Sequence, residues 1–322
     1  MKNSTLSTMA HSEVPARARR SALVLLALVA LGGPALAAEP PRPDEPGTGR
    51  FPALKEEVAS LPNHVVYRPA DLSALGKQKL GVLAWGNGGC SENGASVRFH
   101  LLEIASHGYL VIATGGIYSG PGAHTPPKYP APPPGQPAPQ PTTAAQMSQA
   151  VDWALAENRR AGSPLFGRID PKQIAYSGHS CGGMQTLKLG GEPRVRTLIV
   201  HNSGIPDPWP AQFPKMDLNN ASLLALHTPV LYILGGEKDV AYKMGMDNFR
   251  RISHVPVAVA NLPVAHGGTF NEPNGGAAAA VAVRWLDWQL RGDKKAAKYF
   301  VGKDCDLCRD SRWTYERRQF PK

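Results

Sequence analysis

A serine stands at the centre of a glycine-rich segment that directly follows an apolar run. The segment Tyr176–Gly183 has the spacing G-x-S-x-G around Ser180. A serine presented on a turn between a strand and a helix takes a strained backbone conformation, and the glycines beside it remove Cβ atoms that would clash with the neighbouring chain. Residues 173–176 are expected to form the strand and residues 184–189 the helix. The pattern therefore predicts Ser180 as a nucleophile.

An acid and a base follow two later apolar runs. Asp239 comes after the run 230–234, and His266 lies in a glycine-flanked loop after the run 257–260. A neutral imidazole can accept the proton of a serine, and a carboxylate fixes the tautomer of that imidazole and stabilises the imidazolium that forms. We therefore predict that Asp239 orients His266 and that His266 activates Ser180.

Both partners of the serine have alternatives. Asp239 is favoured as the acid because it lies at a strand end, but it is also placed to cap a helix that begins near Tyr242. In that case Glu237 or Asp247 would supply the acid. His266 is favoured as the base because its loop lies downstream of the acid. Three other histidines remain as alternatives: His201, His227 and His254.

A second glycine-rich segment, residues 85–90, follows the apolar run 80–84. The backbone amide of Gly88 or Gly89, together with that of Cys181, is predicted to donate to a substrate oxygen that gains negative charge. Loss of one such donor typically costs about 2.7–4 kcal/mol of transition-state stabilisation. A phosphate-binding loop is the weaker interpretation, because the chain lacks the spacing G-x-x-x-x-G-K-[ST].

Apolar runs alternate with amphipathic segments along the chain, which is typical of a mostly parallel, doubly wound sheet with helices on both faces. In such an α/β fold, functional side chains are expected at the C-terminal ends of strands. Strands are expected at 64–69, 79–86, 109–115, 173–178, 196–202, 229–235 and 256–262. Helices are expected at 97–106, 144–159, 242–252 and 277–290. Their core-facing residues are predicted to include Trp153, Leu155, Trp285, Leu286 and Trp288.

The N-terminus has the pattern of a secretory signal peptide over residues 1–37. Arginines precede the apolar run 21–31, which is short for a membrane span, and residues 35–37 have the small-x-small pattern of a cleavage site. Cleavage after Ala37 predicts a periplasmic or secreted protein without stable membrane insertion. An uncleaved anchor is the alternative, and the pair Arg19-Arg20 is compatible with twin-arginine as well as general secretory export.

The length and net charge of the mature chain indicate its domain organisation and its partners. The Pro-rich residues 38–50 are expected to form a flexible leader and residues 51–322 a single catalytic domain, because about 285 residues fit one large α/β domain. Of the net charge of +10, +3 lies in residues 1–37, which leaves +7. The positive residues are scattered apart from the C-terminal tail, and no basic stripe is interleaved with aromatic residues, so no nucleic-acid partner is expected.

Taken together and in this order, these residues resemble the α/β-hydrolase superfamily over about residues 65–292. Within it the chain looks most like secreted esterases of the dienelactone-hydrolase, chlorophyllase and cutinase-like polyester-hydrolase branches. Residues 86–89 resemble their oxyanion loop, and residues 285–288 their last helix. The chain departs from those branches in Cys181, which follows the nucleophile, and in the proline-rich insertion 125–141.

The resemblance implies hydrolysis of carboxylic esters, small or polymeric, through an acyl-enzyme on Ser180, without a metal or organic cofactor. A peptidase or acyltransferase with the same three side chains is one alternative. A catalytically silent hydrolase fold that binds an envelope ligand or partner is another, although the complete order Ser180, Asp239, His266 argues against it.

All four cysteines of an exported chain enter an oxidising compartment. If the fold holds, the loops that carry Cys90 and Cys181 are adjacent, and a disulfide between them is predicted, with two small buried thiols as the alternative. Cys305 and Cys308 form a C-x-x-C near the C-terminus. A local structural disulfide is predicted there, because a zinc site lacks a second ligand pair and a redox pair lacks its strand-to-helix setting.

Residues 120–141 form a proline-rich insertion that cannot be helical, because proline fixes φ and removes an amide donor. One hypothesis places it over or beside the active site, with Tyr118 and Tyr129 in the wall of a substrate pocket. The other is a surface excursion without a catalytic role. Trp85 and Trp209 are further candidates for pocket walls, with core packing as the alternative.

Overall fold

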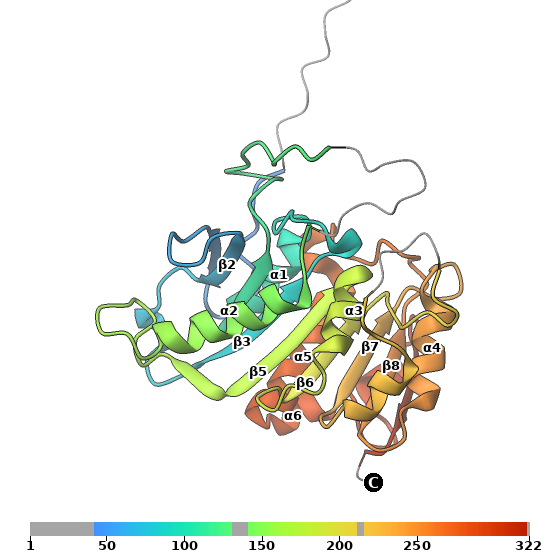
Figure 1. Cartoon of the computed structure of the whole chain (residues 1–322). Coiled ribbons are helices and arrows are strands. Elements are labelled where there is room, and N and C mark those ends of the chain that lie inside the picture. The colour runs from blue at the N-terminus through green and yellow to red at the C-terminus, as the bar shows by residue number, and fades with distance from the viewer. Residues whose placement is uncertain (1–41, 131–140, 211–215, 321–322) are drawn as a thin grey trace, which may run out of the picture. The chain divides into compact units, whose positions relative to one another are not determined.

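A sheet with the strand order β1-β2-β4-β3-β5-β6-β7-β8-β9 lies at the centre of the structure, a computed structural model that describes residues 42–130, 141–210 and 216–320 (Figure 1). The strands from β4 to β8 in this order pair in parallel, whereas β1, β2 and β9 pair antiparallel with their neighbours. The strands are β1 (Ala53–Glu56), β2 (His64–Pro69), β3 (Leu80–Gly86), β4 (Tyr109–Thr114), β5 (Ile169–His179), β6 (Thr197–His201), β7 (Val230–Leu234), β8 (Val257–Asn261) and β9 (Thr314–Arg318).

The parallel strands are continuous apolar runs because neither of their faces meets water. Every residue of β3, β4, β6, β7 and β8 is buried. Successive side chains of a strand point to opposite faces of the sheet. Val82 and Ala84 accordingly pack into one core, and Leu83 and Trp85 into the other.

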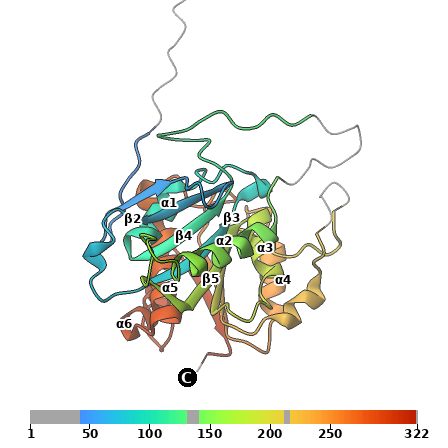
Figure 2. The same ribbon diagram turned by 60° about the vertical axis from the view of Figure 1, so that its left-hand side comes forward.

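Helices cover both faces of the sheet (Figures 1 and 2). Residues of α2, α3 and α4 pack into the core on one face, and residues of α1 and α5 into the core on the other. This arrangement confirms the predicted α/β fold. The α-helices are α1 (Arg98–Ser106), α2 (Ala144–Glu157), α3 (Cys181–Lys188), α4 (Tyr242–Arg251), α5 (Gly276–Arg291), α6 (Lys294–Ala297) and α7 (Asp306–Arg309). The short 3-10 segments are η1 (Ser73–Leu75), η2 (Gly88–Cys90), η3 (Asn220–Ala225) and η4 (Pro273–Gly275).

Local signals set the ends of two long helices. Thr143 caps the start of α2, where its side chain accepts from the Gln146 amide while the Gln146 side chain accepts from the Thr143 amide. This reciprocal pair satisfies two amides that a helix start leaves without partners. Helix α5 ends at Arg291, and the left-handed φ of 68° at Gly292 turns the chain so that the next amide, of Asp293, donates back to the Asp287 carbonyl at 3.1 Å.

The two edge strands were not predicted from the sequence. β1 and β9 are short, and β9 contains two arginines and a glutamate within the basic tail. An edge strand meets water on one side, so it tolerates charges that a central strand does not. β5 also begins at Ile169, four residues before the expected start, and its register with β3 shifts between Leu80 and Val82.

The folded unit begins before Phe51. The Nε of Arg98 donates to Asp44 at 2.9 Å, and the hydroxyl of Thr48 donates to Glu103 at 2.6 Å, so residues of the expected leader contact α1. Residues 41–322 form one compact unit. The signal-peptide prediction for residues 1–37 lies outside the described residues.

Three of the five predicted core residues agree with the prediction. Leu155, Trp285 and Leu286 are buried. Trp153 and Trp288 are only partly buried, and the indole of Trp153 donates to the hydroxyl of Ser60 at 3.0 Å. Within the described part of the chain, none of the helices combines the length and the hydrophobicity needed to cross a membrane.

Candidate active site

Ser180 occupies the sharp turn between β5 and α3. Its φ of 52° and ψ of −116° lie outside the ordinary regions for a residue with a Cβ. Only glycine fits at two positions of this turn. A Cβ on Gly178 would lie 2.3 Å from the carbonyl oxygen of Gly182, and a Cβ on Gly182 would lie 2.0 Å from the carbonyl oxygen of Gly86. The Ser180 amide donates to His201 in β6 at 3.0 Å. These contacts hold the strained serine at the C-terminal edge of the sheet.

Ser180, His266 and Asp239 lie in one hydrogen-bonded line. The Oγ of Ser180 is 3.0 Å from Nε2 of His266, and Nδ1 of His266 is 2.6 Å from Oδ1 of Asp239. A carboxylate only accepts, so the Nδ1 proton is assigned to the bond with Asp239, and Nε2 then accepts from the serine hydroxyl. The structure thus brings together the three residues that were predicted as nucleophile, base and acid.

The carboxylate of Asp239 is buried and surrounded by donors. The Gly235 amide donates to Oδ2 at 3.0 Å, the Ala241 amide to Oδ1 at 2.9 Å, and Nδ2 of Asn202 to Oδ2 at 2.8 Å. Burial alone would raise the pKa of Asp239, but the hydrogen bonds from His266 and these three groups outweigh it and lower the pKa below its usual value. Asp239 is therefore an anion at neutral pH.

Asn202 is a site residue that the sequence analysis did not identify. It follows the last residue of β6 and is buried, with a left-handed φ of 45°. Its Nδ2 donates both to Asp239 and, at 3.1 Å, to the carbonyl of Ala265. Asn202 therefore links the acid loop to the loop of His266. A polar residue directly after a buried parallel strand is the signal that could have indicated it.

His179, the residue before the serine, was also missed. Its Nε2 lies 2.8 Å from the carbonyl oxygen of His266, and the two imidazole rings are 5.0 Å apart. Burial lowers the pKa of His179 to about 4. The ring is therefore neutral at neutral pH, and it donates to the His266 carbonyl.

The glycine-rich loop after β3 lies beside the start of α3. The carbonyl of Asn87 accepts from the amides of Gly182 at 3.0 Å and Cys90 at 3.2 Å. The side chain of Asn87 donates to the carbonyls of Ser91 and Thr114 at 2.8 and 2.7 Å. This bonding holds the loop against the turn at Ser180. The donation of the Gly88, Gly89 and Cys181 amides to a substrate oxygen remains a prediction.

Both predicted disulfides are present. Cys90 and Cys181 are bonded with their Cα atoms 5.2 Å apart, so the alternative of two buried thiols is wrong. Cys305 and Cys308 are bonded within the C-terminal segment. The first bond joins the glycine-rich loop directly to the residue after Ser180.

None of the alternative bases and acids takes part in the hydrogen-bonded line of Ser180, His266 and Asp239. His201 is fully buried against Trp85, His100 and Phe270, and neither of its ring nitrogens has a hydrogen-bond partner in the described residues. Asp247 is half-buried and pairs with Arg251, and Glu237 is exposed in the loop between β7 and α4 that carries Asp239. The remaining two histidines bond to backbone carbonyls of other segments: His227 to Glu192 and His254 to Leu226.

The predicted pocket-wall residues divide into buried and exposed ones. Trp85 is fully buried in the core, so the pocket-wall hypothesis is wrong for this residue. Trp209 is partly buried. Tyr129 is exposed and its hydroxyl donates to Glu92 at 2.7 Å, while the ring of Tyr118 packs edge-on against His124. Residues 131–140 of the insertion lie outside the described residues.

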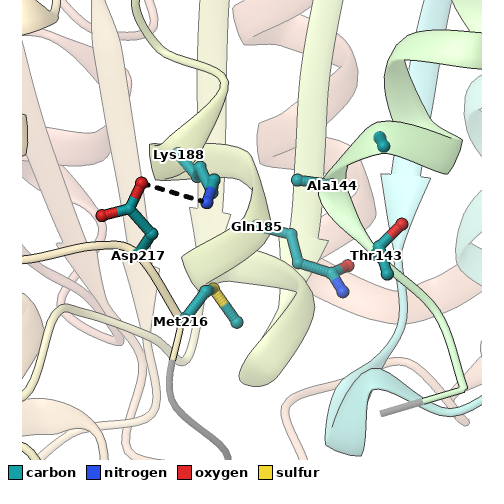
Figure 3. Close-up of a pocket in the computed structure, with 7 residues that line it drawn as sticks. Thr143, Ala144, Gln185, Lys188, Met216 and Asp217 are labelled. Carbon is teal, nitrogen blue, oxygen red and sulfur yellow. Dashed lines mark ion pairs between the residues drawn. The ribbon is translucent and has the colours of Figure 1, made fainter.

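A cavity of about 260 Å³ flanks α3, the helix that follows Ser180. Gln185 and Lys188 face it from α3, Thr143 and Ala144 from the start of α2, and Asp217 lies 3.8 Å from the amine of Lys188 (Figure 3). A second cavity, of about 510 Å³, lies between the loop after β7 and the segment before β9.

Among the described residues, no group of three or more His, Cys, Asp or Glu side chains is arranged to hold a metal ion.

Comparison with known proteins places this geometry in context. No protein-family model matches the chain. Among curated proteins, the chain is similar to the cutinase of Thermobifida fusca (strain YX), with 27% identity over 194 residues. The match covers 56% of each protein, so the chain spans just over half the length of that relative. The similarity and the mostly parallel sheet between two helical layers identify the architecture as an α/β-hydrolase fold.

Proposed function

We propose that this protein is a serine hydrolase that cleaves carboxylic ester bonds. Ser180 is the nucleophile, His266 acts first as base and then as acid, and Asp239 orients His266. The observation that carries the proposal is the pair of distances along this line, 3.0 Å from Ser180 to His266 and 2.6 Å from His266 to Asp239. A strained turn, a buried carboxylate and an imidazole between them match what nucleophilic catalysis by serine requires.

Acylation follows from this geometry. The Oγ of Ser180 attacks the ester carbonyl carbon while its proton moves to Nε2 of His266, and the carbonyl oxygen becomes an oxyanion. The imidazolium is stabilised by Asp239 and then gives its proton to the alcohol oxygen as the carbon–oxygen bond breaks. The products of this step are the free alcohol and an acyl ester on Ser180.

Deacylation repeats the same proton transfers with water as the nucleophile. His266 takes a proton from the water molecule as its oxygen attacks the acyl carbon, and returns that proton to Oγ of Ser180 as the acyl–enzyme bond breaks. The carboxylic acid leaves and the free serine is restored. No redox or metal step is needed to balance either half of the reaction.

The oxyanion is proposed to accept from the amide of Cys181 and from the amide of Gly88 or Gly89. Support comes from the hydrogen bonds of Asn87 and from the Cys90–Cys181 disulfide, which together hold the glycine-rich loop beside the turn at Ser180. A rigid arrangement of donors stabilises a developing charge without reorganisation during the reaction.

Carboxylic esters are the proposed substrate class because the curated relative is named a cutinase. We also propose that the protein is exported, because both disulfides form and persist in oxidising compartments and residues 1–37 have the pattern of a signal peptide. The mature protein would then act in the periplasm or outside the cell.

The test is hydrolysis of p-nitrophenyl esters from acetate to palmitate by protein that starts at Ala38, with Ser180→Ala as the matched variant. We expect turnover that the substitution abolishes, with an optimum of acyl length that distinguishes a small pocket from a long groove. Equal rates for the two folded proteins would reject Ser180 as the nucleophile. Absence of turnover in both would reject hydrolysis of simple esters.

A further inference from the structure

We propose that His179 is a positioning residue for the base: it holds the backbone of His266 so that the His266 imidazole faces Ser180. This inference rests on the proposed function. His179 directly precedes Ser180 in the chain, and its side chain is hydrogen-bonded to His266. The inference adds a positioning residue to Ser180, His266 and Asp239.

The first support is the bond itself. Nε2 of His179 lies 2.8 Å from the carbonyl oxygen of His266, and a carbonyl can only accept, so Nε2 carries the proton. The bond joins the end of β5 to a loop 87 residues later in the chain. It therefore fixes the base relative to the strand that carries the serine.

The second support is that the loop of His266 needs to be held. Ala265 has a left-handed φ of 59°, a conformation that is strained for a residue with a Cβ. The Ala265 amide donates to the Gly235 carbonyl at 2.9 Å, and the side chain of Asn202 donates to the Ala265 carbonyl at 3.1 Å. These bonds fix the residue before His266, and His179 supplies the corresponding bond at His266 itself.

The third support is the packing around the His179 ring. The ring lies 5.0 Å from the ring of His266 and 5.0 Å from that of Phe270. The glycine-rich loop also contacts the ring closely, since a Cβ on Gly88 would lie 2.5 Å from Nδ1 of His179. The imidazole is therefore confined between the glycine-rich loop and the base loop, so a shift of either loop has to move it.

The charge state of His179 fits this role. Burial lowers its pKa to about 4, so the ring stays neutral at neutral pH. A cation at this position would oppose the imidazolium that forms on His266 about 5 Å away. A neutral donor positions the base without that repulsion.

The experiment compares two substitutions of His179. His179→Phe keeps a ring but removes the donor, whereas His179→Gln places an amide donor near the position of Nε2. We expect His179→Phe to lower kcat roughly 10- to 100-fold with KM within about twofold, because a small misplacement of a catalytic group costs up to about 100-fold. We expect His179→Gln to retain kcat within about fivefold.

The control is His254→Phe. His254 is exposed, and the substitution removes an analogous bond of 2.9 Å between Nε2 and the carbonyl of Leu226. It should leave kcat unchanged. The rate at which a fluorophosphonate labels Ser180 should follow kcat in all variants, since both require an activated serine. The labelling rate tests the role of His179 even if no ester is turned over. A wrong substrate class can therefore be distinguished from a wrong role for His179.

Wild-type kcat and labelling rate in folded His179→Phe would overturn the proposal. Equal losses in His179→Phe and His179→Gln would also overturn it, because the ring rather than the donor would then matter. Thermal unfolding of each variant shows whether it is folded. If His179→Phe does not fold, the kcat of His179→Gln is compared with that of the wild type, and a loss of much more than about fivefold would overturn the proposal.

Discussion

Cys90 and Cys181 are bonded across the two loops that meet beside Ser180, with their Cα atoms 5.2 Å apart. Cys181 is the first residue of α3 and Cys90 ends the short helical turn of the glycine-rich loop. A covalent link at this point fixes the distance between the two segments that are proposed to supply oxyanion donors.

Removal of this disulfide should lower both stability and activity. The bond closes a loop of 91 residues, and the chain-entropy relation assigns about 4–5 kcal/mol to a loop of this length. We expect Cys90→Ser with Cys181→Ser to lower the free energy of unfolding in urea by about 2–5 kcal/mol and to reduce kcat/KM. The matched control, Cys305→Ser with Cys308→Ser, opens a loop of only three residues and should leave kcat/KM unchanged. Equal effects of the two double variants on kcat/KM would contradict the assigned role.

Asn202 should influence the acid through a single amide. Asn202→Ala removes a hydrogen bond to a buried carboxylate, a loss of about 1.5–3 kcal/mol, so kcat/KM should fall roughly 10- to 100-fold. Asn202→Asp should be worse, because a second carboxylate beside Asp239 raises the pKa of the pair. Asn158→Ala, which removes bonds to Ile169 at the far end of β5, is the control for stability alone. Activity of Asn202→Asp equal to wild type would exclude the proposed coupling.

Gly88→Ala should damage the site through His179. The added methyl group would lie 2.5 Å from Nδ1 of His179, so the ring or the loop has to move. We expect kcat/KM to fall at least about 10-fold with little change in the unfolding temperature, since the contact lies at the site and not in the core. Steady-state kinetics and thermal unfolding of this one variant are sufficient. Unchanged kinetics would show that the loop accommodates the methyl group without displacing His179.

Two buried histidines should make stability depend on pH. Burial lowers the pKa of His100 to about 3 and that of His201 well below its usual value. Below about pH 6.5 the unfolded chain binds protons that the folded chain does not, so stability is fully present above that pH and is lost as pH falls toward about 3.

The slope of the free energy of unfolding against pH should reach about 1.4 kcal/mol per pH unit for each such histidine. His100→Leu should reduce this slope between about pH 6 and pH 4, a range that lies below the ordinary histidine pKa and above that of folded His100. Urea unfolding at a series of pH values would measure the slope. His227→Leu, at an exposed position, is the control. A slope that His100→Leu leaves unchanged would show that His100 is charged in the folded protein.

The central part of the fold was predictable because its strands are apolar runs. β3, β4, β6, β7 and β8 begin and end within about one residue of the predicted limits, and the same is true of β2. The turn at Ser180 was predictable from its glycines. Gly178 and Gly182 mark a turn whose backbone segments approach too closely for any side chain.

The edge strands and the supporting side chains were not predictable from pattern alone. β9 pairs with β8 through its backbone while its side chains meet water, so arginines give no strand signal there. Asn202 and His179 act through partners that lie 63 and 87 residues away in the chain. Only the assembled sheet brings these groups together, because its topology aligns the C-terminal ends of β5, β6, β7 and β8.

The measurement that tests the central claim most directly is covalent labelling of the disulfide-intact protein by a fluorophosphonate, with the modified residue located by peptide mass analysis. The account predicts one adduct per molecule, on Ser180, with loss of ester turnover in proportion to labelling and with slow labelling of His266→Gln. A folded protein that stays unlabelled, or one labelled on another residue while turnover persists, would contradict it.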